Sequence, residues 1–462
     1  MVKHDRLLVG KGVKMCAHDP QGIDRAKLLL PVQIGHGDTN CELGTGSRGR
    51  LPIMRLSVLL LVLVSFVVTQ KTFAQYAVNV NLPECDYIIR SASDWKKVND
   101  PAYAVICVAP GIYTYKDIGV VELRRSGTAE HPRYLRWYDP AQPGDIDTHV
   151  VDIPPRKQAV IPQFKLMADY WVIDRIVMRG GRHQNTLAAG ASHNVLNRIL
   201  IEGGTATLLL RFLESSHNVL QHSVLRNTVA IPGRDSYAIY FDRSESERIV
   251  DNEIYNYGGG IQQSPLSLNN HVVYGNEMYI TDELYTDCRG HRDKQGECMC
   301  SEGMAVVLKG VNRPGTTFRI ENNLIYGHRR HDELCMGSGT PGVAIDLGSG
   351  GSDTRNVIIK GNILLNRVPN NIYTGLHVGD VEITGNVIGY GEYGITNLYG
   401  DNMTITDNLY IDNAKDYHTG RKAVFRTTYN NNRKITDSEK AEMCFQVKKF
   451  TAPHLSCVSD LQ

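Results

Sequence analysis

The chain has little that would mark it for nucleic acid or for a membrane. Its 462 residues carry 50 Lys and Arg against 49 Asp and Glu, a formal net charge of +1. Nucleic-acid binding needs a strongly basic stripe, so we expect no nucleic-acid partner. Aromatic residues make up only 8% of the chain. Few of them fall on the positions predicted below to face outward, which weakens an interpretation based on sugar rings stacking on aromatic side chains.

The one long apolar run is too short and wrongly flanked for a membrane span, so no stable membrane insertion is expected. It follows Met54 and Arg55 and precedes Thr72 and Ala74, small residues at the third and first positions before Gln75. This arrangement predicts a signal peptide over 54–74 and a secreted or periplasmic protein. Upstream of it, 1–53 shows no periodicity and is interpreted as a non-native or disordered extension. The alternative is a signal anchor with 1–53 in the cytoplasm.

Eight of the ten cysteines lie after the predicted cleavage site. An even number in an exported chain favours disulfides. Their grouping suggests Cys85 with Cys107 and Cys444 with Cys457, and places four near one insertion: Cys288, Cys298, Cys300 and Cys335. The alternative for Cys298 and Cys300 is a metal site, although they lack the two-residue spacer usual for zinc.

The chain is rich in one recurring motif: an apolar pair, a polar residue or two, often Asn, and more apolar residues. A period of about 20–30 residues predicts stacked supersecondary units. Since each unit is short, β-branched and interrupted by Gly and Asn, the units are strands. We therefore predict a single all-β domain, a right-handed parallel β-helix over 75–414, followed by a tail or cap over 415–462. The motif occurs at 195–201, 219–225, 249–255, 272–278, 318–325, 357–363, 381–387 and 403–409.

Two details refine this prediction. Residues 169–181 match 192–204 without a gap, a shift of 23 residues, and the next unit is shifted by 24. Residues 94–98 read as a short amphipathic helix that caps the open end of the solenoid, which would otherwise expose a sheet edge. Stacking also predicts an asparagine ladder at a tight turn, because Asn tolerates left-handed backbone: Asn252, Asn276, Asn323, Asn362, Asn386 and Asn408.

With these repeats, 84–413 resembles the pectin-lyase-like superfamily of right-handed β-helix proteins. The opening at 105–113 and 126–132 is similar to the first coils of the chondroitinase-B and alginate-lyase family. The resemblance implies secretion and action on acidic polysaccharides, most often by β-elimination. The chain departs from the known catalytic patterns, however. It contains no Lys-Ser followed by Arg-His-Gly, no paired Asp with Gly-His-Gly as in polygalacturonases, and no Asp-Pro-His-Asp as in mannuronan epimerases.

One strand of each coil gathers polar side chains on its outward positions, because successive residues alternate between the two faces. Two insertions, 281–303 and 327–342, fall beside these strands, and insertions in repeat folds usually gather on the binding face. One predicted outward column reads Tyr240, Gln262, Val307, Asp346, His377 and Thr396. The neighbouring column reads Asp242, Ser264, Lys309, Gly348 and Gly379.

Lys309 is the leading candidate for the base that removes the proton next to a uronate carboxylate. The loop residues His328, Arg329 and Arg330 would supply a positive field and clamp the carboxylate. An outward lysine on a strand is, however, usually only a solvated side chain. Tyr240 and His377 are the spare acid–base candidates. Gln262, Asp242 and Arg292 are the remaining candidates for binding the substrate, and a calcium ion would be held by Asp332, Asp346 and Glu302, which alternatively orient the arginines.

The leading hypothesis is therefore a monomeric, secreted lyase acting on an acidic, uronic-acid polysaccharide. One alternative is a glycoside hydrolase or epimerase on the same face. Asp242 and Asp346 are predicted about four coils, or about 19 Å, apart, too far for a hydrolytic pair that needs about 5–10 Å. The other alternative is a non-catalytic glycan-binding or adhesion solenoid.

Overall fold

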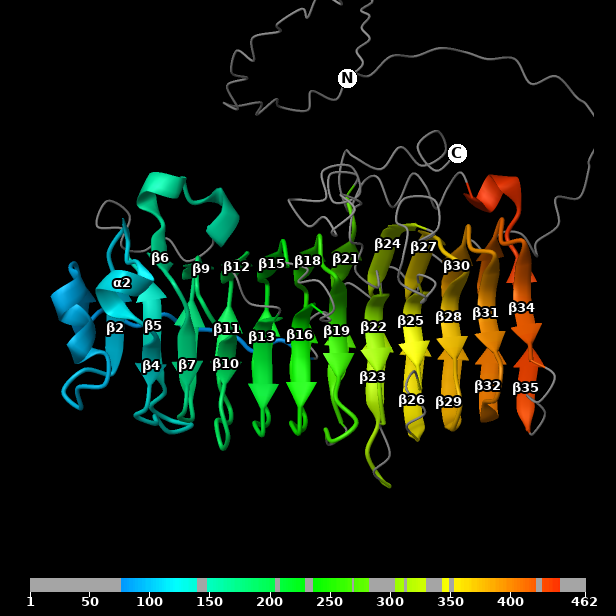
Figure 1. The fold of residues 1–462 in the computed structure, drawn as a ribbon, viewed down its shortest axis with the longest axis horizontal. Helices are drawn as coiled ribbons and strands as arrows, with labels where there is room; N and C mark the ends of the chain where they lie inside the picture. Colours follow the sequence, from blue (N-terminus) through cyan, green and yellow to red (C-terminus); the bar gives the residue numbers. More distant parts are fainter. Residues whose placement is uncertain are drawn as a thin grey trace, which may run out of the picture. The chain divides into compact units, whose positions relative to one another are not determined.

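Three parallel sheets wind together through the chain in a fixed order (Figure 1). The computed structural model describes residues 76–138, 148–203, 208–228, 236–267, 270–281, 304–310, 314–329, 343–348, 353–420 and 426–440. Within these ranges the chain passes repeatedly from sheet A to sheet B to sheet C, and every strand pair is parallel. The right-handed parallel β-helix predicted from the sequence is confirmed.

Sheet A has 13 strands. They are β1 (Tyr87–Ile89), β2 (Val105–Val108), β5 (Arg133–Trp137), β8 (Trp171–Asp174), β11 (Val195–Asn197), β14 (Val219–Gln221), β17 (Arg248–Val250), β20 (Val272–Tyr274), β23 (Phe318–Glu321), β26 (Thr354–Lys360), β29 (Val378–Thr384), β32 (Asp401–Thr406) and β35 (Thr427–Asn430).

Sheet B has 12 strands. They are β3 (Gly111–Ile112), β6 (Ala159–Ile161), β9 (Val177–Arg179), β12 (Leu200–Glu202), β15 (Val224–Arg226), β18 (Glu253–Tyr255), β21 (Glu277–Tyr279), β24 (Leu324–Arg329), β27 (Ile363–Arg367), β30 (Val387–Gly389), β33 (Leu409–Ile411) and β36 (Arg433–Lys434).

Sheet C has 11 strands. They are β4 (Val121–Leu123), β7 (Phe164–Leu166), β10 (Asn185–Leu187), β13 (Leu208–Leu213), β16 (Tyr237–Asp242), β19 (Gly259–Gln263), β22 (Met304–Leu308), β25 (Val343–Leu347), β28 (Asn370–Thr374), β31 (Tyr393–Asn397) and β34 (Lys415–Thr419).

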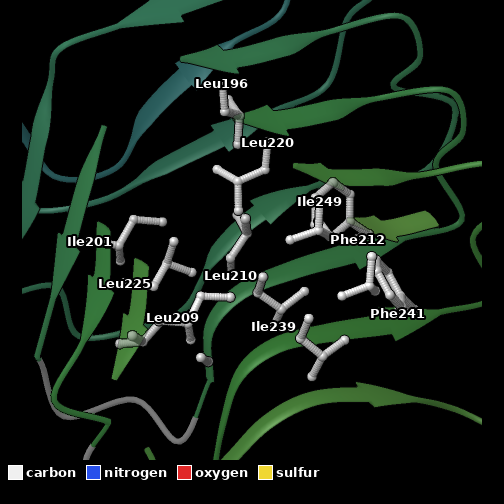
Figure 2. Packing of buried hydrophobic residues seen from close by; sticks show 14 of the residues in the cluster. Leu196, Ile201, Leu209, Leu210, Phe212, Leu220, Leu225, Ile239, Phe241 and Ile249 are labelled. Carbon is white, nitrogen blue, oxygen red and sulfur yellow. The ribbon is translucent and has the colours of Figure 1, made fainter. Parts of the chain in front are cut away.

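The predicted register is also confirmed. Val195 pairs with Val172, a shift of 23 residues, and with Val219, a shift of 24. Equivalent apolar side chains therefore stack inside the solenoid, where Figure 2 shows Leu196, Leu220 and Ile249 from sheet A in one row. These three side chains are fully buried, and each contributes about 1.5–3 kcal/mol by leaving water. The interior thus fixes the spacing of everything displayed outside.

The asparagine ladder lies at the turn from sheet A to sheet B, as predicted. Asn252 donates its backbone N–H and its side-chain Nδ2 to Oδ1 of Asn276, both at 3.0 Å, and every later member repeats this pattern. The ladder continues one coil further, to Asn432. The residue before each ladder position has positive φ, as in Asp251 at 52°, which explains why Asp, Asn and Gly precede these asparagines.

A second interior ladder, at the turn from sheet C to sheet A, has no uniform sequence signal. The backbone N–H of Asn194 donates to Asn218, that of Asn218 donates to Glu247, and that of Glu247 donates to His271. Glu247 is completely buried, and burial raises the pKa of its carboxyl to about 8. A ladder position usually filled by a neutral amide is therefore filled here by a carboxylic acid that burial keeps protonated near neutral pH.

The N-terminal end is capped as expected. A short 3-10 helix, η2 (Ala92–Lys97), buries Trp95 over the first coil, and α2 (Tyr115–Ile118) lies nearby in sequence. The predicted Cys85–Cys107 disulfide is present, with a Cα–Cα distance of 5.7 Å, whereas the other six cysteines of the predicted mature chain lie outside the described residues. Among the described residues, no helix has the length and apolar character to cross a membrane.

The sheets continue past residue 414, where the sequence analysis ended the solenoid. Strand β34 (415–419) completes the coil begun by β32 and β33, and β35 and β36 begin another over 427–434. The side chains of these three strands are largely exposed and polar, so the apolar repeat used to find the other coils is missing there. The predicted segments 1–53 and 54–74 lie outside the described residues.

Two non-repetitive segments cover outward faces. Residues 76–83 lie on sheet A, where both backbone groups of Val78 bond to the side-chain amide of Gln221 at 2.7 and 2.8 Å. The excursion between β5 and β6 contains η3 (Val150–Asp152) and η4 (Pro155–Lys157), and its Val150 packs on the outward valines and leucine of β6, β9, β12 and β15. Part of the outward face of sheet B is therefore covered by this excursion.

Candidate functional site

The outward face of sheet C carries the polar columns predicted from the sequence, with one error. The strand register aligns Thr186, Arg211, Tyr240, Gln262, Val307, Asp346, Tyr373 and Thr396. The position assigned to His377 belongs to Tyr373, so that assignment is wrong. His377 lies at the turn before β29 with φ of 60°. The sequence analysis took 375–379 as the sheet C strand of this coil, but that strand is β28, which ends at Thr374.

Asp242 forms an ion pair that sequence analysis did not predict. Arg211, one coil earlier, donates Nη2 to Oδ2 of Asp242, and Arg243 lies 3.5 Å from Oδ1. The Asp242 side chain is only 11% exposed, whereas the Arg211 side chain is 27% exposed. The Nε atom of Arg211 is buried without a hydrogen-bond partner in the described structure. Asp242 therefore holds a guanidinium that keeps unused donors, and it is better suited to orienting Arg211 than to touching a substrate.

Gln262 lies one step beyond Tyr240 in the same column. It is 5% exposed, and its Oε1 atom has no hydrogen-bond partner within the described ranges. A buried amide oxygen left unpaired costs about 1–3 kcal/mol. A hydroxyl group of a bound molecule would remove that cost, so Gln262 remains a good candidate for binding.

Lys309 directly follows β22 and is partly exposed. Its backbone N–H donates to the carbonyl oxygen of Gln263 at 3.3 Å, which continues the β19–β22 ladder and aligns Lys309 with Ser264 and Asp242. Two steps of about 4.8 Å separate Lys309 from the Asp242 position, or about 10 Å. The predicted column containing Lys309 is therefore confirmed, except that Gly375 replaces Gly379 after Gly348.

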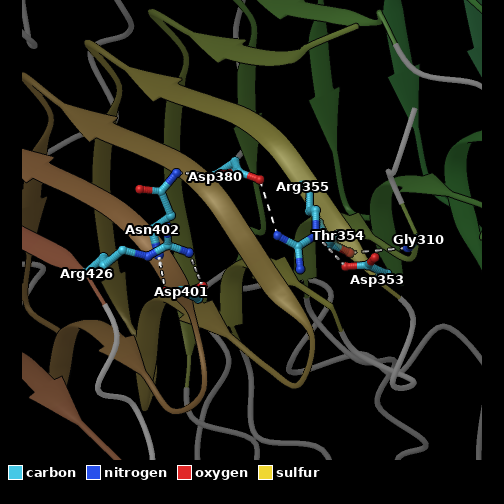
Figure 3. Close-up of polar contacts among 8 residues, drawn as sticks. All are labelled: Gly310, Asp353, Thr354, Arg355, Asp380, Asp401, Asn402 and Arg426. Atoms are coloured by element: carbon cyan, nitrogen blue, oxygen red, sulfur yellow. Dashed lines mark hydrogen bonds and ion pairs between the residues drawn. The ribbon is translucent and has the colours of Figure 1, made fainter. Parts of the chain in front are cut away.

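The turn after Lys309 joins this face to a charged ladder at the start of sheet A strands (Figure 3). The backbone N–H of Gly310 donates to Oγ1 of Thr354 at 3.2 Å. Arg355 then bridges Asp353 at 3.0 Å and Asp380 at 3.3 Å. Further along, Asp380 accepts from Asn402, and Arg426 pairs with Asp401 at 2.8 Å. These partly to largely exposed charges form a polar rim beside Lys309. The sequence analysis missed the rim because it considered only the outward positions of sheet C, whereas these residues lie at the start of sheet A strands.

His328 does not belong to the outward face. It is 1% exposed, with Nε2 3.0 Å from the Tyr257 hydroxyl and Nδ1 2.9 Å from Oδ1 of Asn366. Burial lowers the pKa of the imidazole to about 4, so the ring is neutral near pH 7 and has no contact with solvent. Its assignment as a substrate-binding residue is wrong, since it follows a register shift in β24 that turns it into the core.

The remaining predicted residues are only partly placed. Asp346 lies in the outward column between Val307 and Tyr373 and is 2% exposed. Arg329 ends β24. In the described part of the chain, no three His, Cys, Asp or Glu side chains come together as a metal site. Arg292, Glu302, Arg330 and Asp332 lie outside the described residues.

The register also corrects one spacing. From Tyr240 to Asp346 there are three strand steps, through Gln262 and Val307. Along the solenoid axis, the positions of Asp242 and Asp346 are therefore about 14 Å apart, and not the predicted 19 Å. It still exceeds the 5–10 Å of a hydrolytic carboxylate pair.

The chain is similar to several solved structures at low sequence identity. No family model and no curated protein sequence matches the chain. Among solved structures, an alginate lyase from a Paenibacillus species is 14% identical, with a TM-score of 0.41, covering 74% of this chain and 98% of that one. A pectate lyase is 12% identical, with a TM-score of 0.46, covering 80% and 86%. A surface adhesin of Streptococcus pneumoniae is 10% identical, with a TM-score of 0.40, covering 73% and 87%.

At these identities the likeness concerns the fold alone. The three sheets themselves establish a parallel β-helix. A fold does not determine a function, so what this chain does must be argued from its own side chains.

Proposed function

We propose that this protein is a secreted polysaccharide lyase that cleaves a uronic-acid polymer by β-elimination on the outward face of sheet C. The observation that carries the proposal is the register, which aligns Arg211, Tyr240 and Gln262 on successive coils and brings Lys309 to the same face. A base, a carboxylate-binding cation and a hydrogen-bonding amide therefore fall within about 15 Å.

The chemistry needs three roles. A base removes the proton from the carbon next to the carboxylate, a cation stabilises the charge that develops there, and an acid protonates the departing glycosidic oxygen. Lys309 takes the proton as base. The carbon–oxygen bond then breaks as the ring double bond forms, and the hydroxyl of Tyr240 returns a proton to the leaving oxygen.

Arg211 supports the remaining role. Its guanidinium is held by Asp242, and the Arg211 side chain stays 27% exposed, which supports contact with a substrate carboxylate. Arg is suited to this task because its planar fork matches a carboxylate. Gln262 supplies an acceptor for a sugar hydroxyl. A calcium ion held by Asp332, Asp346 and Glu302 remains a prediction, and so do Arg330 as a carboxylate clamp and Arg292 as a substrate-binding residue.

The test measures ultraviolet absorbance of the unsaturated uronide during incubation with alginate, pectate and glycosaminoglycans. We expect absorbance with one of these polymers and its loss in Lys309→Met. New reducing ends without absorbance would contradict elimination and indicate hydrolysis. Binding to a polymer without any product, unchanged in Lys309→Met, would instead indicate a glycan-binding solenoid.

A further inference from the structure

A cavity on the outward side of sheet B lies apart from the face described above. It has a volume of about 430 Å³ and is lined by residues of β15, β18, β21 and the turns before them, with His149 from the excursion after β5. Small-molecule sites usually measure about 300–1,000 Å³, so a sugar-sized molecule fits whereas a bare ion leaves most of it empty. The ionisable groups that line it are His149, His222, Asp251, Glu253 and Glu277.

His149 closes one side of the cavity through a defined contact. Its Nε2 atom donates to the carbonyl oxygen of His222 at 2.7 Å, and its neighbour Val150 is fully buried against sheet B. Burial lowers the pKa of the His222 imidazole, so this ring is neutral near pH 7. None of the described residues that line the cavity is Lys or Arg.

Two carboxyl groups lie on adjacent coils within this lining. Glu253 pairs in register with Glu277, so their backbones lie about 4.8 Å apart. The Tyr279 hydroxyl donates to Oε1 of Glu253 at 2.5 Å, and the Tyr326 hydroxyl donates to Oε1 of Glu277 at 2.7 Å. Each tyrosine thereby holds one oxygen of a carboxyl group, and the other oxygen keeps its capacity to accept.

Asp251 adds a third carboxyl group to the lining of the cavity. Its Oδ1 atom is buried and has no hydrogen-bond partner in the described structure. The residue is held at the turn by positive φ, and a Cβ on Gly275 of the next coil would lie 2.1 Å from this oxygen. Burial raises the pKa of both Asp251 and Glu277 to about 7. Such an environment disfavours the negative charges and would be relieved by a positively charged ligand with several N–H donors.

We propose that this cavity binds a sugar-sized primary ammonium ion, as carried by an amino sugar. An ammonium group has three donors and no acceptor, which matches carboxyl oxygens from Glu253, Glu277 and Asp251. A neutral polyol gains the same hydrogen bonds without offsetting the charges, and an anion meets no Lys or Arg side chain among the described residues that line the cavity.

The experiment is isothermal titration calorimetry of the full chain near neutral pH with three ligands that share one carbon skeleton. Glucamine carries an ammonium group, sorbitol a hydroxyl and gluconate a carboxylate. We expect saturable binding of glucamine, binding of sorbitol at least about tenfold weaker, and none of gluconate. Equal affinity for glucamine and sorbitol, or no glucamine binding, would overturn the proposal. Calcium chloride is titrated as well, since calcium binding without glucamine binding would show a metal site.

Matched variants locate the binding. Glu253→Gln and Glu277→Gln keep shape and remove charge, and each should weaken glucamine binding by about tenfold or more. Glu202→Gln is the control, because Glu202 lies on the same sheet but pairs with Arg179 and Arg226 outside the cavity. Thermal unfolding is recorded for every variant. A folded Glu277→Gln variant that binds glucamine like the wild type would refute the site.

Discussion

The outward faces of sheets C and B use the same scaffold and differ in charge. On sheet C, Asp242 is neutralised by Arg211, and Lys309 and Gln262 remain for a ligand. In the sheet B cavity, the carboxyl groups are joined by no arginine or lysine among the described lining residues. Both faces have the same spacing between successive coils, because the packing of the interior sets that spacing. In this solenoid, therefore, spacing comes from the core, and we expect ligand preference to follow the sign of the charges in the outward column.

The largest expected effect separates the two faces. Lys309→Met removes the proposed base and should lower kcat about 10²–10⁴-fold, the range found for positioned acids and bases, while glucamine binding stays unchanged. The measurement pairs the uronide absorbance assay with calorimetry on one preparation.

Lys165→Met is the matched control for that prediction. Lys165 also lies outward on sheet C, aligned with Thr186, five strand steps before Val307. Its loss should leave kcat within twofold of wild type. Equal losses in both variants would mean that the lysines act only through the general charge of the face.

The interior that both faces share predicts that the free energy of unfolding depends on pH. Glu247 has its pKa raised to about 8 by burial, against 4.5 in the unfolded chain. Between these values the folded protein keeps a proton that the unfolded chain releases, so the free energy of unfolding should fall as pH rises from about 5 to 8, by up to about 1.4 kcal/mol per pH unit. Thermal unfolding of the wild type and Glu247→Gln checks this.

The slope is the decisive quantity, and not the absolute stability. In Glu247→Gln the amide does not ionise, so this contribution to the slope should vanish even if the variant is less stable at every pH. Parallel curves for the two proteins would show that Glu247 is ionised in its ladder, held by the donors of Ser215 and Asn218.

The third prediction concerns the asparagine ladder at the turn from sheet A to sheet B. Asn323 accepts from Asn276 and donates to Val273 and Asn362. Asn323→Ala leaves these buried groups unpaired and should lower the free energy of unfolding by about 2–4 kcal/mol, measured by urea denaturation. Asn430→Ala, at an exposed position of β35, should change it by less than about 0.5 kcal/mol.

The sequence predicted the features that repetition creates. The Asn252–Asn408 ladder, the 23-residue shift and the outward positions of Tyr240 and Lys309 all follow from stacking equal units. It failed where the repeat is interrupted. His328 was misplaced because β24 contains a register shift. His377 was misplaced because it lies in a turn whose sequence resembles that of a strand. Partners such as Arg211 for Asp242 were missed because residues 31 apart in sequence become neighbours only through the coil length.

The smallest expected effect concerns the arginine that distinguishes sheet C from sheet B. Arg211→Lys keeps the positive charge but loses the planar fork, so kcat/KM should fall about tenfold, or about 1.4 kcal/mol. Asp242→Asn should cause a similar loss, because Arg211 is then no longer oriented. Combining the two should cost little more than either alone, since they act through one guanidinium.

Arg355→Lys is the matched control, since Arg355 also bridges carboxylates but lies on the charged rim of Figure 3. It should change kcat/KM less than twofold. If Arg355→Lys were as damaging as Arg211→Lys, the substrate carboxylate would lie over the rim, closer to the turn after Lys309. If neither mattered, the sheet C face would lack its carboxylate clamp and its contrast with the acidic cavity would carry no specificity.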